Sequence, residues 1–257
     1  MAKTIVVTGA SSGIGAALAR QLAARGDQVV LAARNKGALQ TLAQELGAHS
    51  LAVPTDVTVR SEVERLRDRA IGTFGSIDVW INNAGRGMSK LVADLTDADV
   101  DDMITVNVKS ALYGVQAVLP HFKDRGAGQI INISSFLSRV PMASIRSAYS
   151  ASKAALNNLT ANLRMDLAAT HPNIHVTLVM PGLVSTEFAQ NAVYGTPPIR
   201  PGAGGAPSQT AEQVAAAITA VIDHPVAEIY TNPQLGGFAR AYFEDVEQFE
   251  AAMRSRS

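Results

Sequence analysis

Short apolar runs alternate with amphipathic stretches along almost the whole chain. The apolar runs are rich in Val and Ile, and few polar residues interrupt them, which is typical of parallel strands covered on both faces. We expect strands at residues 4–8, 28–33, 50–53, 78–82, 129–134, 175–180 and 228–231. Helical periodicity predicts helices at residues 13–25, 36–46, 59–74, 99–125, 149–170 and 210–223.

Turn and capping residues support these boundaries. Gly26, Gly47 and Gly75 each follow a helical stretch, where a glycine is favoured. Thr210 and Gln213 have the spacing of a capping box at the start of the last of these helices. The alternation predicts an α/β fold with a single domain over residues 1–257. We expect a Rossmann-type doubly wound parallel sheet of about seven strands with helices on both faces.

Two segments depart from this alternation. Residues 194–207 (YGTPPIRPGAGGAP) are dense in Pro and Gly, and a long irregular loop in a compact domain often covers a binding site. We therefore expect a substrate lid over residues 188–207. The C-terminal tail, residues 235–257, is rich in aromatic residues, and we expect it to form one more helix against the domain or a second subunit.

The composition narrows the function classes. Of 257 residues, 22 are basic and 22 acidic, and this balance argues against nucleic acid as a partner, which would need a basic surface. No apolar run reaches the ~18 residues of a membrane span, and we expect no targeting segment. Cysteine is absent, which fits a reducing, cytoplasmic compartment. His171 and His175 have a zinc-like spacing, but Pro172 interrupts the helix they would need, so we expect no metal.

A glycine cluster, Thr8–Gly15 (TGASSGIG), follows the first expected strand and opens the first helix. A helix N-terminus offers unpaired N–H groups and a partial positive charge to a pyrophosphate. Gly9 permits a tight turn, Gly13 leaves room for a phosphate, and Gly15 lets the helix pack closely. The residues between these glycines that we expect to contact a dinucleotide are Ser11, Ser12 and Ile14. The spacing is G-x-x-x-G-x-G rather than G-x-G-x-x-G, and the alternative is a plain glycine-rich turn.

The end of the second expected strand indicates which dinucleotide binds. An acidic residue there would hold the 2′-hydroxyl of NAD, whereas an arginine suits the 2′-phosphate of NADP. The strand ends in Arg34 and Asn35 with no acid, so the sequence favours NADP(H) over NAD(H). The alternative interpretation of Arg34 is a solvated loop residue.

Tyr149 and Lys153 stand four residues apart at the start of an expected helix, and therefore on one face of it. A phenol with a pKa near ~10 is a poor base at neutral pH, and a nearby ammonium lowers that pKa. Hydride transfer to a carbonyl needs a proton donor, and the reverse reaction needs a base, so a tuned tyrosine can serve both directions. By spacing alone, the pair is more commonly an ordinary helix neighbourhood.

Other polar residues fall at compatible places. Ser134 and Ser135 end one expected strand, and Asn82–Gly85 (NNAG) ends another. Carboxyl ends of parallel strands meet at the edge where open α/β sheets bind ligands. Asn107 lies between apolar residues within the expected helix 99–125, where its amide needs a partner. The coincidence of these features with the tyrosine–lysine pair predicts a hydride-transfer site.

Together these motifs resemble the short-chain dehydrogenase/reductase family. The residues that carry the resemblance are Thr8–Gly15, Asp56 and Val57, Asn82–Gly85, Asn107, Ser134 and Ser135, Tyr149–Lys153 (YSASK), Pro181 and Gly182, and Thr186. They span about residues 4–188 in the order and approximate spacing of the family. No single motif is specific, but the set is.

The resemblance implies a role for each matching residue. Tyr149 would be the general acid/base, Lys153 would lower its pKa and hold the nicotinamide ribose, and Ser135 would orient the substrate oxygen. Asn107 would hold a water and support Lys153 in a proton relay. The remaining cofactor contacts would be Asp56 and Val57 at the adenine, Asn83, Ala84 and Gly85 in the cleft, and Pro181, Gly182, Val184 and Thr186 near the nicotinamide.

One departure from the family pattern concerns the serine. The family serine usually lies thirteen residues before the tyrosine, but Ser135 lies fourteen before Tyr149, which indicates one extra residue in the loop 136–148. Ser134 or Ser138 could therefore take the role of Ser135.

We therefore expect a cytoplasmic NADP(H)-dependent oxidoreductase that acts on a small-molecule carbonyl or secondary alcohol. The alternative is a catalytically silent NADP-binding sensor or scaffold of the same fold. Arg86, Arg139 and Arg146 lie near the expected site and either bind an anionic substrate group or are solvated. The resemblance also implies a homodimer or homotetramer built from the helices 99–125 and 149–170.

Overall fold

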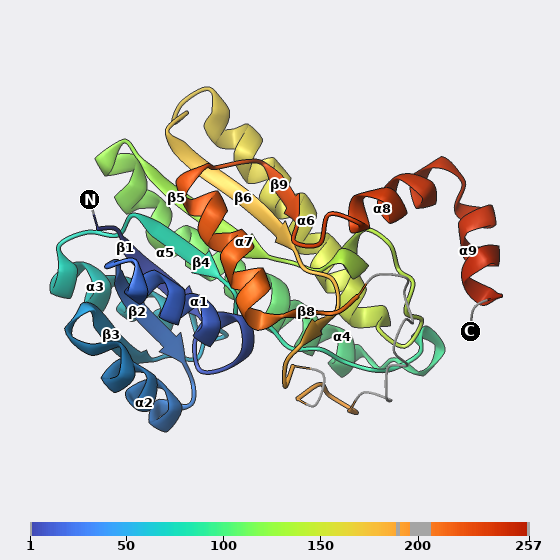
Figure 1. The fold of residues 1–257 in the computed structure, drawn as a ribbon, viewed down its shortest axis with the longest axis horizontal. Helices are drawn as coiled ribbons and strands as arrows, with labels where there is room; N and C mark the ends of the chain where they lie inside the picture. Colours follow the sequence, from blue (N-terminus) through green and yellow to red (C-terminus); the bar gives the residue numbers. More distant parts are fainter. Residues whose placement is uncertain (1, 189–190, 196–206, 256–257) are drawn as a thin grey trace.

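The computed structural model describes residues 2–188, 191–195 and 207–255. Seven parallel strands form one sheet in the order β3-β2-β1-β4-β5-β6-β9 (Figure 1). The strands are β1 (Thr4–Thr8), β2 (Gln28–Ala33), β3 (Ser50–Pro54), β4 (Val79–Asn82), β5 (Gly128–Ile133), β6 (Ile174–Met180) and β9 (Glu228–Tyr230). The strand order reverses between β1 and β4, and ligands of such sheets bind at the carboxyl ends beside this point.

Helices cover both faces of the sheet (Figure 1). On one face lie α1 (Gly13–Ala24), α2 (Lys36–Leu46) and α7 (Ala211–Asp223); on the other lie α3 (Arg60–Phe74), α5 (Ser110–Arg125) and α6 (Ser147–Ala168). This confirms the predicted single-domain, doubly wound fold. Apart from the expected helix 99–125, the observed bounds of these strands and helices lie within two residues of the expected ones. Within the described ranges, no helix combines the length and apolar character needed to cross a bilayer.

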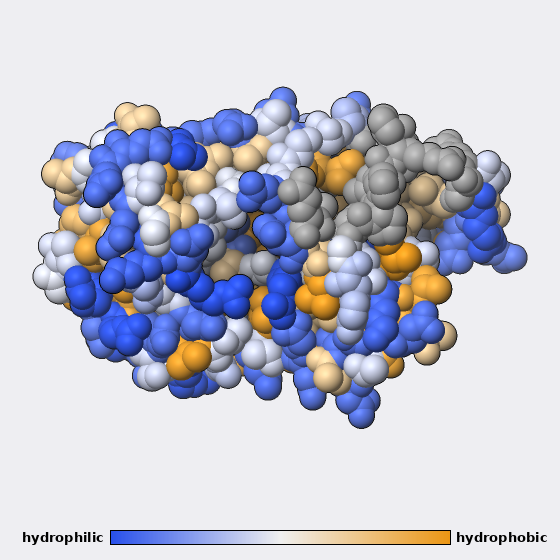
Figure 2. Space-filling model, turned by 90° about the horizontal axis from the view of Figure 1, so that it is seen from below, coloured by the Kyte–Doolittle hydropathy of each residue, from blue (hydrophilic) through white to orange (hydrophobic). Residues whose placement is uncertain are grey.

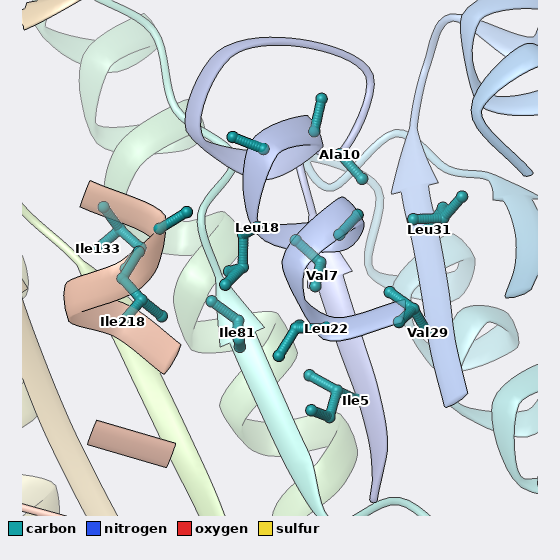
Figure 3. Close-up of a cluster of buried hydrophobic side chains, with 14 of the residues drawn as sticks. Ile5, Val7, Ala10, Leu18, Leu22, Val29, Leu31, Ile81, Ile133 and Ile218 are labelled. Carbon is teal, nitrogen blue, oxygen red and sulfur yellow. The ribbon is translucent and has the colours of Figure 1, made fainter. Parts of the chain in front are cut away.

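The strands are continuously apolar because each face of the sheet has its own core. On β1, Ile5 and Val7 point toward α1, where Leu18 and Leu22 pack on them (Figure 3). Val6, between them, belongs to the opposite core. All five side chains are fully buried. Successive strand residues point to opposite faces, so both faces can be buried only if every position is apolar.

The predicted helix ends are also observed. Gly26, Gly47 and Gly75 all have positive φ angles, which non-glycine residues rarely adopt. The capping box forms as expected, with the backbone N–H of Gln213 donating to the hydroxyl of Thr210 at 3.2 Å.

The expected helix 99–125 was wrong as a single regular element. The structure has α4 (Asp97–Ile104), a π-helical turn (Thr105–Lys109) and then α5. Asn107 is the middle residue of the π-turn and is 1% exposed. A π-turn contains one more residue than an α-turn, so it is stable only where tertiary contacts hold it.

The C-terminal tail forms two helices instead of the one expected, α8 (Leu235–Glu244) and α9 (Val246–Arg254). The carboxylate of Asp245 accepts from the backbone N–H of Gln248 at 2.9 Å and so begins a new helix. Figure 1 shows α8 beside the end of β9 and α9 beyond it. A second, two-stranded sheet pairs β7 (Val184–Ser185) with β8 (Gln209–Thr210). Most of the expected lid, residues 189–190 and 196–206, lies outside the described residues.

Candidate active site

The predicted site residues gather at the carboxyl edge of the sheet. The strands β1, β4, β5 and β6 are neighbours, so the segments that follow them converge on one place. Figure 2 looks at the molecule from below, toward this edge, and shows a hollow near the middle of the face. Residues far apart in the sequence therefore meet at this edge of the sheet.

The glycine cluster forms a tight turn that packs directly on the neighbouring strand end. Gly9 has a φ of +67°, and a Cβ there would lie 2.9 Å from the Cα of Ala84. A Cβ on Gly15 would lie 2.2 Å from the carbonyl oxygen of Gly9 and 2.7 Å from the amide nitrogen of Asn83. Both glycines are therefore required by close backbone approach.

The start of α1 is open to a ligand. Ser12 is the N-cap residue and is exposed, yet its side chain makes no capping hydrogen bond. The first turn also contains no acidic residue, so nothing in the helix itself neutralises its N–H groups. Opposite, a Cβ on Gly13 would lie 3.4 Å from the methyl carbon of Thr186. The cradle formed by this turn, α1 and Thr186 fits a dinucleotide pyrophosphate.

The segment after β6 forms the other side of this cradle. The carbonyl of Pro181 accepts from the backbone N–H of Phe136 at 2.8 Å, and a Cβ on Gly182 would meet Leu235 of α8 at 2.9 Å. The backbone N–H of Thr186 donates to the carbonyl of Val184 at 3.0 Å. Contacts from Phe136 and Leu235 and a hydrogen bond within the segment thus hold the expected nicotinamide-side segment in place.

Arg34 lies exposed directly after β2, and Asp56 lies two residues after β3, so both stand at the expected adenine end. Burial raises the pKa of Asp56, but hydrogen bonds from Thr58 and the positive charge of Arg34 outweigh this and hold the pKa below its usual value. Asn35 accepts from the N–H of Ala38 at 3.0 Å and caps α2. The exposed basic end of β2 is compatible with a phosphate.

Tyr149 stands in the first turn of α6 and is 7% exposed. Burial raises the pKa of its phenol, while a hydrogen bond with Ser135 and the charge of Arg146 oppose the rise. The net result is a phenol that stays protonated at neutral pH. Its ring packs against Phe188, with 5.8 Å between ring centroids. The structure therefore brings together Tyr149 and Ser135, as the sequence predicted.

The other two serines face elsewhere. The hydroxyl of Ser134 donates to the side-chain oxygen of Asn157 at 2.6 Å. The hydroxyl of Ser138 donates to the carbonyl of Ser135 and accepts from the amide of Asn157 at 2.7 Å. Both hydroxyls therefore fix the loop after β5 onto α6, whereas the Ser135 hydroxyl interacts with the tyrosine.

Lys153 is almost completely buried, with 3% exposure. Its ammonium donates to the carbonyl of Ile133 at 2.8 Å, and burial lowers its pKa from 10.5 to about 8. The lowering of the tyrosine pKa by Lys153 stays a prediction, and the Arg146 charge opposes the rise that burial causes in the Tyr149 pKa. A Cβ on Gly85 would lie 3.3 Å from the ammonium nitrogen, so the absence of a side chain at Gly85 lets Lys153 pack closely against the backbone there.

Asn107 holds the loop after β4. Its side-chain oxygen accepts from the N–H of Arg86 at 3.0 Å, and its amide donates to the carbonyl of Arg86 at 3.0 Å and to Ser152 at 3.1 Å. A Cβ on Gly85 would also lie 3.0 Å from the Asn107 oxygen. The π-turn thus brings Asn107 close to Gly85, against which the ammonium of Lys153 also packs.

Sequence reasoning missed a buried polar ladder beneath the site. The indole of Trp80 donates to Asn82 at 2.8 Å, Asn82 donates to Asn132 at 2.8 Å, and Asn132 donates to Thr160 at 2.9 Å. The ladder ties β4 and β5 to α6 behind Lys153. The available signal was Asn132, a polar residue within an otherwise apolar strand.

Comparison with known proteins agrees with this geometry. The model of the short chain dehydrogenase family matches residues 3–195. An uncharacterised oxidoreductase of Staphylococcus aureus (strain MW2) is 44% identical over 187 residues, which cover 72% of this chain and 80% of the relative.

Solved structures are similar over nearly the whole chain. A short-chain dehydrogenase/reductase from Burkholderia phymatum in complex with NAD has a TM-score of 0.85 at 28% identity, covering 96% of this chain and 95% of its own. The closed form of a serine dehydrogenase complexed with NADP⁺ has a TM-score of 0.79 at 30% identity, covering 88% and 93%. The match of the family model, together with these similarities, shows that this chain is an oxidoreductase of the short-chain dehydrogenase/reductase family.

Proposed function

We propose that the protein is an NADP(H)-dependent oxidoreductase that transfers a hydride between the nicotinamide and a carbonyl or secondary alcohol, with Tyr149 as general acid/base. The observation that carries this proposal is the arrangement of Tyr149, Ser135 and Lys153, buried together at the carboxyl edge, with the ammonium of Lys153 packed against Gly85. The silent sensor has no such observation in its favour, since a sensor does not need a buried acid/base.

A bound nicotinamide supplies or accepts the hydride. In the reductive direction, the hydroxyl of Ser135 orients the substrate oxygen, and the phenol of Tyr149 donates its proton to the alkoxide as it forms. The raised pKa of Tyr149 keeps this proton in place at neutral pH. Oxidation runs in reverse, with the phenolate removing the alcohol proton.

Lys153 and Asn107 support this acid/base. The ammonium of Lys153 packs against Gly85 and is fixed by the carbonyl of Ile133. We infer that it holds the nicotinamide ribose and replenishes the proton of Tyr149. Asn107 fixes the loop that carries Gly85 and thereby keeps this glycine against the ammonium of Lys153.

Replacing Tyr149 with Phe tests the mechanism. The variant Tyr149→Phe should lose roughly 10²- to 10⁴-fold in kcat, the contribution of a positioned general acid. Binding of NADPH, followed by its fluorescence, should stay unchanged. Tyr242→Phe, on α8 away from the site, is the matched control and should keep full activity. Turnover of Tyr149→Phe close to wild type would exclude this acid/base, and NADPH binding without turnover of any carbonyl by the wild type would favour the sensor.

The proposal of NADP rests on Arg34. Arg34→Asp should lower the ratio of kcat/KM for NADPH to that for NADH by roughly 10- to 100-fold, because it replaces a charge-assisted contact with repulsion. Lys36→Asp, a nearby exposed cation in the first turn of α2, is the control and should change the ratio much less. An unchanged ratio in Arg34→Asp would refute the cofactor preference.

We also propose a cytoplasmic homodimer or homotetramer built through α5 and α6. Two large apolar side chains on α6, Leu159 and Met165, are 44% and 76% exposed, which is compatible with burial against a second copy. Light scattering after gel filtration tests the assembly, and a monomer at micromolar concentration would contradict it. Cell fractionation tests the location.

A further inference from the structure

Residues 191–195 lie against the proposed acid/base, and we call them the cover segment. Val193 packs on an apolar cluster that includes Tyr149. The ring of Phe188, just before the cover segment, packs on the ring of Tyr149 with 5.8 Å between centroids. The N–H of Asn191 donates to the carbonyl of the residue before Phe188 at 2.9 Å. The cover segment and Phe188 are therefore connected, and both contribute to the burial of Tyr149.

Backbone hydrogen bonds hold the cover segment on the loop after β4. The N–H of Val193 donates to the carbonyl of Gly87 at 2.9 Å, and the N–H of Ser89 donates to the carbonyl of Val193 at 3.1 Å. Met88 and Val193 form a parallel bridge between these two bonds. The hydroxyl of Ser89 also donates to the carbonyl of Gly195 at 2.6 Å. The cover segment thus pairs with this loop as a short strand would.

The same loop contacts the start of α6 with its other side. The N–H of Lys90 donates to the carbonyl of Ile145 at 2.7 Å, and the carbonyl of Lys90 accepts from the hydroxyl of Ser147 at 2.6 Å. Ser147 is the first residue of α6 and lies two positions before Tyr149. The loop after β4 therefore lies between the cover segment and the helix that carries the acid/base.

A buried carboxylate anchors the cover segment. The hydroxyl of Tyr194 donates to Oδ1 of Asp99 at 2.9 Å, and Asp99 is only 5% exposed. Oδ2 of Asp99 accepts from the ammonium of Lys90 at 2.7 Å and from the hydroxyl and N–H of Thr96 at 2.8 and 2.9 Å. These bonds, and that of Lys90 above all, hold the pKa of Asp99 far below its usual value. Tyr194 thus binds a permanent anion, and such a charge-assisted bond is stronger than one between neutral groups.

Little else favours the observed conformation of Tyr194. Its side chain is 63% exposed, and the ammonium of Lys90 lies 4.9 Å from the centroid of its ring. Among the residues that the structure describes, Tyr194 is the one non-glycine residue with a positive φ, at 62°. An aromatic residue is strained in this region, and such strain persists only where other contacts outweigh it. The bond to Asp99 therefore opposes a backbone that would otherwise relax.

We propose that Tyr194 is a latch, whose hydroxyl bond to Asp99 holds the cover segment, and with it Phe188, against Tyr149 while substrate is bound. Tyr194 acts through the cover segment and not on the reacting atoms, so it is a positioning residue. When the bond breaks, the backbone of Tyr194 relaxes and the cover segment separates from the loop after β4. One side of Tyr149 is then free for substrate and product to exchange. The effect on turnover rests on the proposed acid/base role of Tyr149, whereas the latch itself does not.

The variant Tyr194→Phe tests the latch, because it removes the hydroxyl and keeps the ring beside Lys90. Amide hydrogen exchange of the full chain is measured by NMR, without ligand. The N–H groups of Ser89 and Val193 should exchange roughly 10-fold faster than in the wild type, since their bonds join the cover segment to the loop. Tenfold is the lower end for a bond to a charged group, as expected for an exposed tyrosine. The N–H of Lys90, bonded to Ile145 on the other side of the loop, should keep its rate.

The matched control is Tyr113→Phe on α5, a tyrosine whose ring lies 4.3 Å from the guanidinium of Arg60. This variant should leave all of these exchange rates unchanged. Wild-type rates at Ser89 and Val193 in Tyr194→Phe would overturn the inference. The same acceleration at Lys90 as at the other two amides would also overturn it, because Tyr194 would then only stabilise the fold.

Turnover tests the consequence at Tyr149. With NADPH and a ketone that the wild type reduces, Tyr194→Phe should raise KM roughly 10-fold and leave kcat equal or higher, because the reacting groups stay intact and ligands leave faster. A lower kcat at unchanged KM would refute the positioning role. If the wild type reduces no ketone or aldehyde, the proposed function fails, while the exchange rates still decide whether Tyr194 is a latch.

Discussion

Lys153 offers a direct test of the buried site because its charge is costly to the fold. We consider the variant Lys153→Met, which keeps an unbranched side chain of similar length and removes the ammonium. The wild-type ammonium is 3% exposed and has the carbonyl of Ile133 as a hydrogen-bond acceptor. The variant should be inactive, yet more stable than the wild type at neutral pH.

The magnitude follows from the pKa of Lys153, which burial lowers from 10.5 to about 8. At ~1.4 kcal/mol for each pH unit, the charged form costs the folded protein about 3 kcal/mol. Methionine removes this cost but leaves the carbonyl of Ile133 without that donor, at about 1 kcal/mol. We expect Lys153→Met to be more stable by about 2 kcal/mol at pH 7.

The difference must depend on pH in one direction. Because the folded-state pKa of Lys153 is the lower one, the unfolded chain binds more protons between pH 8 and pH 10.5, and wild-type stability rises relative to the variant over this range. Below pH 8 the cost is fully present. Near pH 10.5 it is gone, and the wild type should then be the more stable protein by about 1 kcal/mol, through its hydrogen bond.

Urea unfolding of the wild type and of Lys153→Met at pH 7, 8.5 and 10 measures how the difference between their free energies of unfolding changes with pH. Lys123→Met, an exposed lysine on α5, is the control and should change stability by less than ~0.5 kcal/mol at every pH. A variant that is less stable than the wild type at pH 7, or a difference that stays constant up to pH 10, would refute the reasoning.

Three further predictions concern stability and are all measured by chemical denaturation. Gly15→Ala places a Cβ 2.2 Å from a backbone oxygen and should destabilise the protein by about 1–3 kcal/mol or more. Gly72→Ala, in open space within α3, should stabilise it by about 0.5–1 kcal/mol. Equal effects of the two substitutions would contradict the close packing at Gly15. Asn132→Leu breaks the buried ladder and should cost about 2–3 kcal/mol, so a neutral effect would remove the ladder's assigned role. Neutral His121 accepts from the backbone N–H of Ile77 at 3.1 Å, and burial lowers the pKa of its imidazole. As the pH falls, His121 is therefore protonated in the unfolded state before it is protonated in the folded state. The free energy of unfolding should decrease as the pH falls below about 6.5. His121→Gln should show less of this decline, and an identical pH dependence would contradict it.

The fold was predictable because its signals are local and repeated. Every central strand is apolar on both faces, so each could be located from its run of Val and Ile. The carboxyl-edge positions of Gly9, Asn83 and Ser135 followed from their places directly after expected parallel strands. Their catalytic and cofactor roles, and those of Tyr149 and Lys153, stay predictions until the variants above are measured.

Other features depend on contacts that spacing does not record. Residues 105–109 are compatible with a regular helix, and the wider turn there is held by hydrogen bonds from Asn107 to the backbone of Arg86 and to Ser152. Which of Ser134, Ser135 and Ser138 faces Tyr149 depends on the direction of each hydroxyl. Asn157 binds the hydroxyls of Ser134 and Ser138, and it lies about twenty residues further along the chain. The division of the C-terminal tail into two helices, in contrast, could have been predicted from the sequence. Asp245 and Gln248 have the spacing of a helix N-cap and the residue that it caps.

The π-helical turn also affects how this chain should be aligned with others. An α-helix rotates by about 100° per residue, so the extra residue in the turn offsets the faces of α4 and α5 by about that angle. Surface connections usually tolerate changes of length. A one-residue gap at 105–109 would instead rotate one helix relative to the other and turn a buried face outward. Such a gap in a relative would therefore signal a different site geometry, not neutral variation in length.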